Sequence, residues 1–215
     1  MPVEMDAQVL EVLGQSVPDG AVEPVAAIDM PTAYVDRAHL VAVCQTLRDH
    51  PRLQFSFLVE ITAADYHPAE PRYEVVYHLA CLGEAMGDSG GDAPPQRRLR
   101  LKVRVPSEES PWVPSLTPLW LASNWLEREV FDLFGIAFSG HPDLRRILTP
   151  DDWVGHPLRK DYPAQVRKDA AAWSPMQLTA EEFAANVRAS QVTSAHAARP
   201  RVEGRDESPA GRSED

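Results

Sequence analysis

Residues 124–162 constrain this chain more than any other stretch, because they mix charged and aromatic side chains and interrupt them with glycine and proline. Aromatic rings at this density need somewhere to be buried, so the stretch is not a solvated linker. If the rings are buried, the charges among them must be paired, which makes the stretch poor material for a plain core. The sequence therefore predicts a surface that another protein covers, or a functional site.

Charge is distributed unevenly along the 215 residues. The net charge of −11 argues against nucleic acid as a partner, because phosphate binding requires a basic face. Residues 137–168 nevertheless carry six Lys or Arg and four Asp, a net charge of +2, so that the rest of the chain carries −13. The constraining stretch is thus part of a basic strip on an acidic protein.

The cysteines and the apolar runs bear on the compartment. Cys44 falls on the apolar side of a helical pattern and Cys81 in a strand-like run, so both are predicted to be buried, reduced thiols. The N-terminus, MPVEMDAQ, is acidic and lacks the apolar run of a signal peptide. No stretch approaches the ~18 apolar residues that span a bilayer, so any membrane association is expected to come through a partner.

Periodicity predicts two helices in the N-terminal quarter. Residues 5–13 carry apolar side chains at helical spacing and are predicted to form a short helix that Gly14 ends. Asp36 can cap a second helix that runs to about Asp49. Between the helices, residues 25–30 are flanked by prolines and predict a short strand.

Alternation of apolar residues predicts three strands in a sheet with one apolar and one wet face. The apolar series are Leu53, Phe55, Phe57, Val59 and Ile61; Tyr73, Val75, Tyr77, Leu79 and Cys81; and Leu99, Leu101, Val103 and Val105. The other face of the third strand carries Arg98, Arg100, Lys102 and Arg104. A solvated sheet face is the ordinary interpretation of these charges, and docking onto an acidic partner is the alternative. Residues 83–96, rich in Gly, Asp and Pro, predict a long hairpin loop.

Residues 113–134 are predicted to be helical, with a start at Thr117-Pro118, a break near Ser123 and a stop at Gly135. Within this helix the consecutive residues 127–129, Glu-Arg-Glu, point about 100° apart and cannot share one site.

Glu129 falls on the apolar stripe of that helix, so its carboxylate is predicted to be buried and to need a basic partner. Arg145 and Arg146 are the nearest candidates in sequence. Such a pair is either an acid–base pair or an ion-pair network that fixes the helix to the following loop, and we favour the network.

The histidines of this region predict turn anchors rather than ligands. His141 and His156 each follow a glycine and precede a proline, and no third or fourth metal ligand stands at a usable spacing. With two cysteines the chain cannot supply the four thiolates of an iron–sulfur cluster. The sequence also lacks a nucleophile elbow, a phosphate loop and a dinucleotide fingerprint.

The predicted fold class is α+β, with a small mixed or antiparallel sheet covered by helices and an extended irregular C-terminal arm. The predicted divisions are an N-terminal body (1–116), a helix and interface segment (117–163), an arm with a short helix (164–192) and a disordered tail (193–215). The capping box of Thr179 with Glu182 predicts the arm's helix, and the shortage of apolar residues predicts the disorder of the tail.

Residues 127–148 closely resemble the signature of the 30 kDa (C) subunit family of respiratory NADH:quinone oxidoreductase, complex I. The positions that fill the family pattern are Glu127, Arg128, Glu129, Asp132, Leu133, Phe134, His141, Arg145, Ile147 and Leu148. Residues 155–163, GHPLRKDYP, also look like the family, whereas residues 1–116 agree only in general layout. The resemblance implies an interface or structural role for Glu127, Arg128, Glu129, Asp132, His141, Asp143, Arg145, Arg146, Trp153, His156, Arg159, Lys160, Asp161 and Tyr162.

The resemblance also implies a cofactor-free subunit of the hydrophilic arm, whose extended segment wraps the neighbouring D subunit near the place where quinone is reduced. Iron–sulfur clusters and FMN would then belong to partner subunits. The D subunit would be the chief neighbour, with the B and I subunits beside it, and the chain would lie peripherally on the cytoplasmic side of the bacterial cell membrane. Two alternatives stay open: the corresponding subunit of a group 4 nickel–iron hydrogenase, and an independent hydrolase or metal enzyme that uses His141, Asp143, His156 and Asp161.

Overall fold

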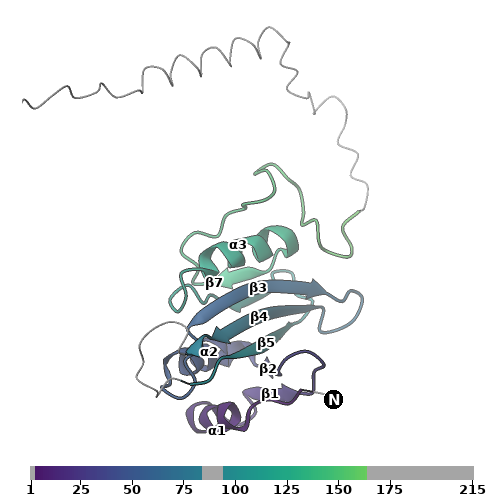
Figure 1. The fold of residues 1–215 in the computed structure, drawn as a ribbon. Helices are drawn as coiled ribbons and strands as arrows, with labels where there is room; N and C mark the ends of the chain where they lie inside the picture. The colour runs from purple at the N-terminus through teal and green to yellow at the C-terminus, as the bar shows by residue number, and fades with distance from the viewer. Residues whose placement is uncertain (1–2, 84–93, 164–215) are drawn as a thin grey trace, which may run out of the picture. The chain divides into compact units, whose positions relative to one another are not determined.

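A five-stranded mixed sheet organises the fold (Figure 1). The structure, a computed structural model, describes residues 3–83 and 94–163. Its elements in chain order are α1 (Ala7–Ser16), β1 (Val22–Val25), β2 (Thr32–Val35), the 3-10 turn η1 (Arg37–His39), α2 (Leu40–Asp49), β3 (Phe57–Asp65), β4 (Tyr73–Cys81), β5 (Arg97–Val105), β6 (Trp112–Pro114), α3 (Ser123–Phe134) and β7 (Ala137–Ser139). The strand order is β1-β2-β5-β4-β3, in which only the β2–β5 pair is parallel, and β6 pairs with β7 in a small parallel sheet. The predicted α+β class is confirmed.

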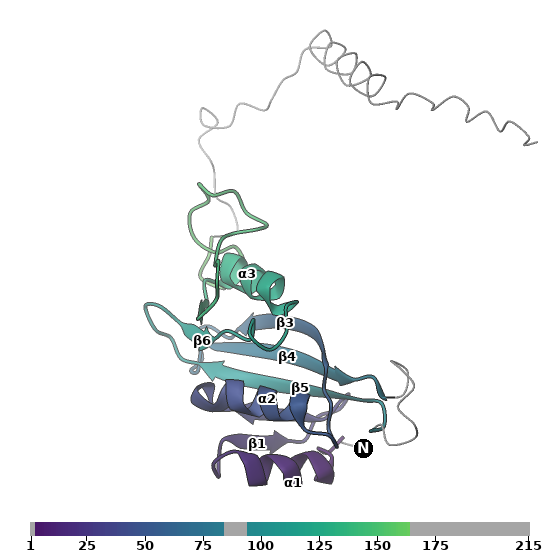
Figure 2. The same ribbon diagram turned by 90° about the vertical axis from the view of Figure 1, so that its left-hand side faces the viewer.

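One face of the sheet holds the core, as the alternation in β4 and β5 predicts. The inward series Leu99, Leu101, Val103 and Val105 is at most 1% exposed. It packs with apolar residues of α1 and α2, which lie along this side of the sheet (Figure 2). Asp36 accepts a hydrogen bond from the amide of Ala38 and so starts η1 and α2, as predicted. The predicted burial of Cys44 and Cys81 is confirmed, and both are free cysteines.

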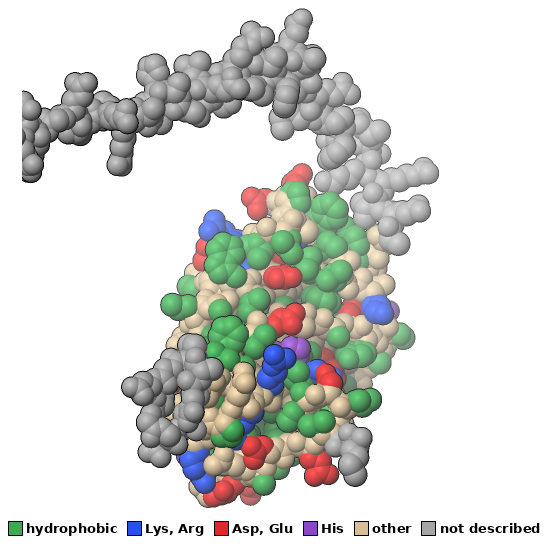
Figure 3. All heavy atoms as spheres, viewed as in Figure 1, with side chains coloured by type: hydrophobic (Ala, Val, Ile, Leu, Met, Phe, Trp, Pro, Cys, Tyr) green, Lys and Arg blue, Asp and Glu red, His purple; other side chains and the backbone are tan. Residues whose placement is uncertain are grey.

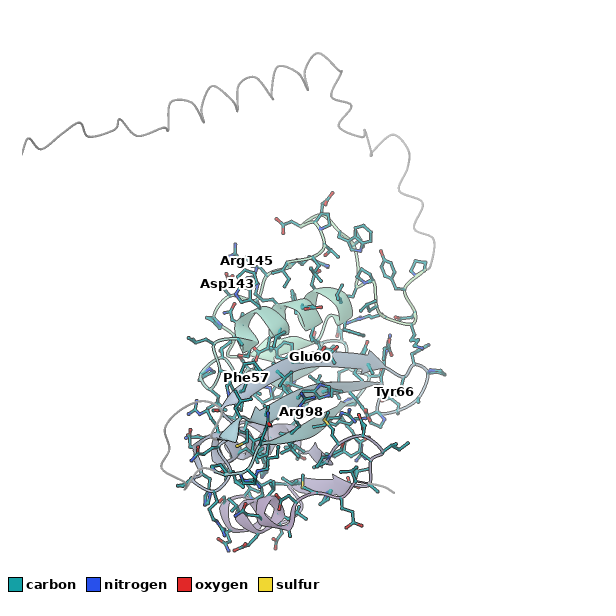
Figure 4. The ribbon with its side chains drawn as sticks, viewed as in Figure 1. Phe57, Glu60, Tyr66, Arg98, Asp143 and Arg145 are labelled. Carbon is teal, nitrogen blue, oxygen red and sulfur yellow. The ribbon has the colours of Figure 1, made fainter. Side chains whose placement is uncertain are left out.

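The opposite face of the sheet carries charges that the chain itself pairs. Lys102 contacts Glu74 at 2.8 Å, and Arg104 contacts Glu23 at 3.0 Å. Arg100 forms an ion pair with Asp29. Figure 4 shows Arg98 and Glu60 on this side of the strands. The solvated-face interpretation therefore accounts for most of the basic row of β5.

The N-terminal helix differs from its predicted bounds. It begins after Asp6, whose side chain accepts a hydrogen bond from the amide of Gln8, and it continues through Gly14 to Ser16. Pro18 explains the later end, because the residue before a proline is driven out of the helical region. Val17 indeed has extended angles, φ −129° and ψ 157°.

The strand predicted for residues 25–30 is also wrong. That segment mostly connects β1 to β2, which pair antiparallel on either side of it. Pro24, a boundary in the sequence prediction, lies inside β1. A proline is tolerated there because β1 is an edge strand, whose one side needs no ladder hydrogen bond.

The first of the three predicted strands begins later than expected and changes phase. An irregularity in the pairing with β4 falls between Leu58 and Glu60. A bulge of this kind shifts the alternation by one residue. As a result Leu58 and Ile61 are buried, whereas Phe57 and Val59, predicted to be buried, are 49% and 46% exposed.

The helix predicted for residues 113–134 is correct only in its second half. Residues 112–114 form β6 instead, and the helix begins at Ser123, where a break is expected from sequence. Its stop at Gly135 is confirmed, with φ +71°. Most of the predicted hairpin loop lies outside the described residues. The capping box of Thr179 and the predicted disordered tail lie entirely outside them.

Candidate functional site

The residues that carry the family pattern lie on α3 and on the segment that follows it, residues 140–163, here called the strap. Both views place α3 beside β3 and the strap beyond α3 (Figures 1 and 2). The strap is largely irregular, as predicted. The short strand β7, between α3 and the strap, is missing from the prediction for this region.

Asp132 joins α3 to the strap. Its carboxylate is fully buried and accepts hydrogen bonds from the amides of Ile147 (3.0 Å), Leu148 (2.7 Å) and Thr149 (2.9 Å). The hydroxyl of Thr149 and the guanidinium of Arg146 (2.8 Å) bind its other oxygen. Burial by itself would raise the pKa of Asp132, but the hydrogen bonds from Thr149, Leu148 and Ile147 outweigh it and hold the pKa well below its usual range.

The ion-pair network expected here exists, but its partners differ from those predicted. Arg146 binds Asp132 rather than Glu129, and it also donates to the carbonyl of Gly155 at 2.9 Å. Arg145 pairs with Asp143 at the surface. Glu129 is exposed, so the prediction of a buried carboxylate at this position is wrong.

Glu127, not Glu129, is the buried member of the Glu-Arg-Glu triplet, at 0% exposure. The buried line of α3 runs through Ser123, Glu127, Val130 and Phe134, because the helix is rotated away from the purely apolar stripe. Trp125, one turn before Glu129 on the same side of α3, is 63% exposed as a consequence.

Two short contacts hold the Glu127 carboxylate in place. It accepts hydrogen bonds from the hydroxyl of Ser115 and the amide of Leu116, each at 2.6 Å. No basic side chain within residues 3–83 and 94–163 pairs with it. Burial raises the pKa of Glu127 to about 7, and the hydrogen bonds from Ser115, Leu116 and Ser123 only partly offset that rise.

The C-terminal end of α3 is closed by side chains of the strap. Arg159 donates to the carbonyls of Phe134 (2.6 Å) and Gly135 (3.3 Å), which have no partner inside the helix. His156 contacts the carbonyl of Asp132 at 2.9 Å. Burial lowers the pKa of His156, and the nearby charges of Arg159 and Arg146 lower it further. A neutral ring at pH 7 then donates from Nδ1 to that carbonyl.

Gly135 is required here for two reasons. Its φ of +71° lies in the left-handed region, and a Cβ at this position would come within 2.4 Å of His156 and 2.5 Å of Arg159. Gly155 has a similar role further along, because a Cβ there would come within 2.8 Å of the ring of Tyr162.

The far end of the strap is fixed to the β3–β4 hairpin by residues that sequence reasoning missed. Arg72 makes a two-pronged contact with buried Asp65, at 3.1 and 2.9 Å, and reaches Asp161 at 2.7 Å. The amide of Lys160 donates to Asp65 at 2.9 Å. Burial opposes ionisation of Asp65, yet its bonds from Arg72, Lys160 and His67 lower its pKa to about 2. The available signal was an acid and a base, Asp65 and Arg72, in the short segment between the first two predicted strands.

The remaining signature residues order the first part of the strap. His141 contacts the carbonyl of Asn124 at 3.1 Å and accepts from the amide of Asp143 at 3.0 Å, which confirms its predicted role as a turn anchor. Arg128 donates to the carbonyl of Arg145 at 3.1 Å. Trp153, further along the strap, is partly buried, and its amide donates to the carbonyl of Pro150.

The alternative metal site is not assembled. Its four candidates are engaged in separate contacts: His141 with Asn124, Asp143 with Arg145, His156 with Asp132, and Asp161 with Arg72. In the part of the chain that the structure describes, no group of three His, Cys, Asp or Glu side chains could hold a metal ion.

The same part contains no helix with the length and apolar character needed to cross a bilayer.

Comparison with known proteins identifies relatives of this arrangement. A family model described as the respiratory-chain NADH dehydrogenase 30 Kd subunit matches residues 33–168. The C subunit of the NADH-quinone oxidoreductase of Roseiflexus sp. (strain RS-1) is 46% identical over 158 residues, which cover 74% of this chain and 84% of that protein. The C subunit from Methylobacterium sp. (strain 4-46) is 38% identical over 177 residues, covering 79% and 76%. A solved trypsin-resistant fragment of Nqo5 is 33% identical, covers 64% of this chain and 96% of that one, and superposes with a TM-score of 0.45.

The family match takes in β2 through the strap, including Glu127, Asp132 and Arg146 with the contacts described above. The chain belongs to the family of the respiratory-chain NADH dehydrogenase 30 kDa subunit, which is the C subunit of NADH-quinone oxidoreductase, complex I.

Proposed function

We propose that this chain is a structural subunit of complex I that holds the D subunit beside the place of quinone reduction and performs no redox step itself. The neighbouring B and I subunits would complete its surroundings, and the chain would lie on the cytoplasmic side of the cell membrane, attached through these partners. NADH oxidation, quinone reduction and proton translocation would be carried out by the assembled complex.

The observation that carries this proposal is that α3 and the strap bury their charged side chains and expose several large apolar ones. The buried charged side chains bind other groups of the same chain, as Asp132 binds Arg146. Large apolar side chains of α3 and the strap point outward instead: Trp125, Leu148, Val154 and Leu158 are between 51% and 85% exposed, and Leu121, which precedes α3, is 90% exposed. Figure 3 shows hydrophobic side chains gathered over this part of the molecule. An exposed cluster of apolar side chains, held on a segment that buried ion pairs and hydrogen bonds fix in place, is typical of a surface that a protein partner covers.

The absence of a redox step is supported by the chemistry of the chain as a whole. The sequence has two cysteines, Cys44 and Cys81, and both are buried in the core. An iron–sulfur cluster takes about four thiolates. Burial raises the pKa of the Cys44 thiol above its ordinary value. The thiolate form, which is the metal ligand and the nucleophile, is therefore disfavoured.

Substitution of the apolar surface tests the scaffold. In cells that express the complex, Trp125→Glu combined with Val154→Glu is expected to reduce the amount of D subunit recovered with this tagged chain at least tenfold. Ile28→Glu is the matched control, because Ile28 is 92% exposed and belongs to neither α3 nor the strap. Thermal unfolding of the purified chains should be unchanged in both. Normal recovery of the D subunit with the double variant would refute the proposed contact.

A second measurement tests the absence of a cofactor. The purified chain is expected to contain no stoichiometric iron, zinc or flavin and to show no visible absorption. A metal or flavin that approaches one per chain would contradict the proposal.

A further inference from the structure

A cavity of about 510 Å³ lies where the carboxyl ends of β2 and β5 meet, and the proposed function makes no use of it. Its size falls within the range of about 300–1,000 Å³ that is usual for ligand sites. The side chains that matter in its lining are Glu23, Tyr34, Asp36, Arg37, Arg104 and Trp112. None of the lining residues belongs to α3 or the strap, so the cavity is separate from the surface assigned to the D subunit.

Two arginines in this cavity are held against aromatic rings. The guanidinium carbon of Arg104 lies 3.4 Å from the centroid of the Tyr34 ring, and that of Arg37 lies 4.4 Å from the centroid of the Trp112 ring. Tyr34 is itself fixed by a hydrogen bond of 2.6 Å to Glu74. A guanidinium stacked on a ring keeps its edge available, and that edge matches a carboxylate.

Carboxylates of the chain already occupy part of these edges. Arg104 contacts Glu23 at 3.0 Å, and Arg37 contacts Glu108 at 3.4 Å. The side chain of Glu23 is 62% exposed, and an exposed pair of this kind contributes little and exchanges readily. Among the described residues, Nε and Nη2 of Arg37 donate no hydrogen bond. The two glutamates therefore show that these arginines bind carboxylates, and the exposed Glu23 pair holds Arg104 only weakly.

We propose that this cavity binds an acidic segment of a neighbouring subunit, whose carboxylates take the places of those of Glu23 and Glu108. The inference rests on the family only in that the chain works among other subunits. Carboxylates are favoured over phosphate because Glu23 and Asp36 also line the cavity, and a dianion would be repelled more strongly than a single carboxylate. The carboxylate of Asp36 is otherwise engaged with the amide of Ala38, at 2.7 Å. Trp112, 40% exposed, offers the segment an apolar contact.

The test is binding of fluorescein-labelled hexaglutamate to the full-length chain, followed by fluorescence anisotropy. At about 0.15 M salt the Debye length is about 8 Å, so the net charge of the chain is screened while contacts inside the cavity persist. Arg37→Gln with Arg104→Gln is expected to weaken binding at least tenfold. Glu23→Gln with Glu108→Gln is expected to strengthen it about threefold, because the internal competitors are gone.

Arg98→Gln is the matched control, since Arg98 lies on the same face of the same strand as Arg104 but does not line the cavity. It should bind the peptide as the unchanged chain does, and hexaglutamine should not bind. Equal loss in the Arg98 variant, or equal binding of hexaglutamine, would overturn the proposal. So would absence of binding, weakened binding in the glutamate variant, or binding of inorganic pyrophosphate in place of the peptide. None of these results depends on recovery of the D subunit, so the two proposals fail separately.

Discussion

Glu127 and Asp132 are both fully buried carboxylates on α3, yet their neighbours drive their pKa values in opposite directions. Asp132 receives three amides, a hydroxyl and a guanidinium, which favour the ionised form. Glu127 has hydrogen bonds from Ser115, Leu116 and Ser123 but no cation among the described residues, so burial dominates and the neutral form is favoured. At the scale of single residues, burial sets the penalty and the donors decide whether it is overcome.

The raised pKa of Glu127 predicts a pH-dependent stability. The carboxyl titrates near 4.5 in the unfolded chain and near 7 in the folded one, so the folded state binds the proton more tightly. The stability that comes from this tighter proton binding by Glu127 is fully present below pH 4.5 and is lost as the pH rises through about 7. The loss is on the order of 3 kcal/mol by pH 8. Glu127→Gln, which keeps the size and one acceptor, should remove this loss, as measured by urea unfolding between pH 5 and pH 8.

Glu129→Gln is the control for that measurement, because Glu129 is two positions away on the same helix and exposed. Other titrating groups affect all three proteins equally, so only the difference between variants is interpreted. If the stability of Glu127→Gln and of the unchanged chain falls in parallel from pH 5 to pH 8, Glu127 is ionised throughout and its environment has been misjudged.

At the scale of elements, the end of α3 depends on one glycine being both left-handed and small. Gly135→Ala would meet the backbone penalty of about 1–2 kcal/mol and would also push against His156 and Arg159. Gly140 has a similar φ of +84° with no atom within 4 Å of a Cβ. We therefore expect Gly135→Ala to lower the free energy of unfolding by about 1–3 kcal/mol more than Gly140→Ala does. Equal effects of the two substitutions on the free energy of unfolding, measured by chemical denaturation, would mean that His156 and Arg159 move away from the new Cβ without loss of stability.

The elements predicted well from sequence are those whose pattern is long and regular. The predictions for β4, β5 and the helix after Asp36 are correct because nine or ten residues repeat one period. The errors arise where a local device interrupts the period. A bulge in β3 exposes Phe57, and an edge position lets β1 accept Pro24.

The error on α3 has a different cause. Hydrophobic pattern alone places Glu129 in the core, whereas burial of Glu127 depends on donors from Ser115 and Leu116. Those donors are twelve and eleven residues away and approach only through the fold. Likewise the contact of Asp65 and Arg72 with Asp161 joins residues far apart in sequence, so no local pattern could reveal it.

At the scale of the whole molecule, Asp132 is expected to control assembly rather than turnover. Asp132→Asn leaves Arg146 without its carboxylate, and breaking a buried pair typically costs ~3–5 kcal/mol. A domain has only about 5–15 kcal/mol of stability in total. We expect native gels to show much less complex in the variant, with normal NADH:quinone activity per assembled complex. Glu129→Gln should assemble normally. A tenfold lower rate in a fully assembled Asp132 variant would place this carboxylate in the mechanism.

The cluster of amides around Asp132 has a consequence for native-state hydrogen exchange. The N–H groups of Ile147, Leu148 and Thr149 all bind one carboxylate oxygen, although they lie in a segment without helix or strand. They have no ladder to protect them one by one, so a single opening event must release all three. We expect their exchange with deuterium to be slow, to proceed at one shared rate, and to become fast together in Asp132→Asn.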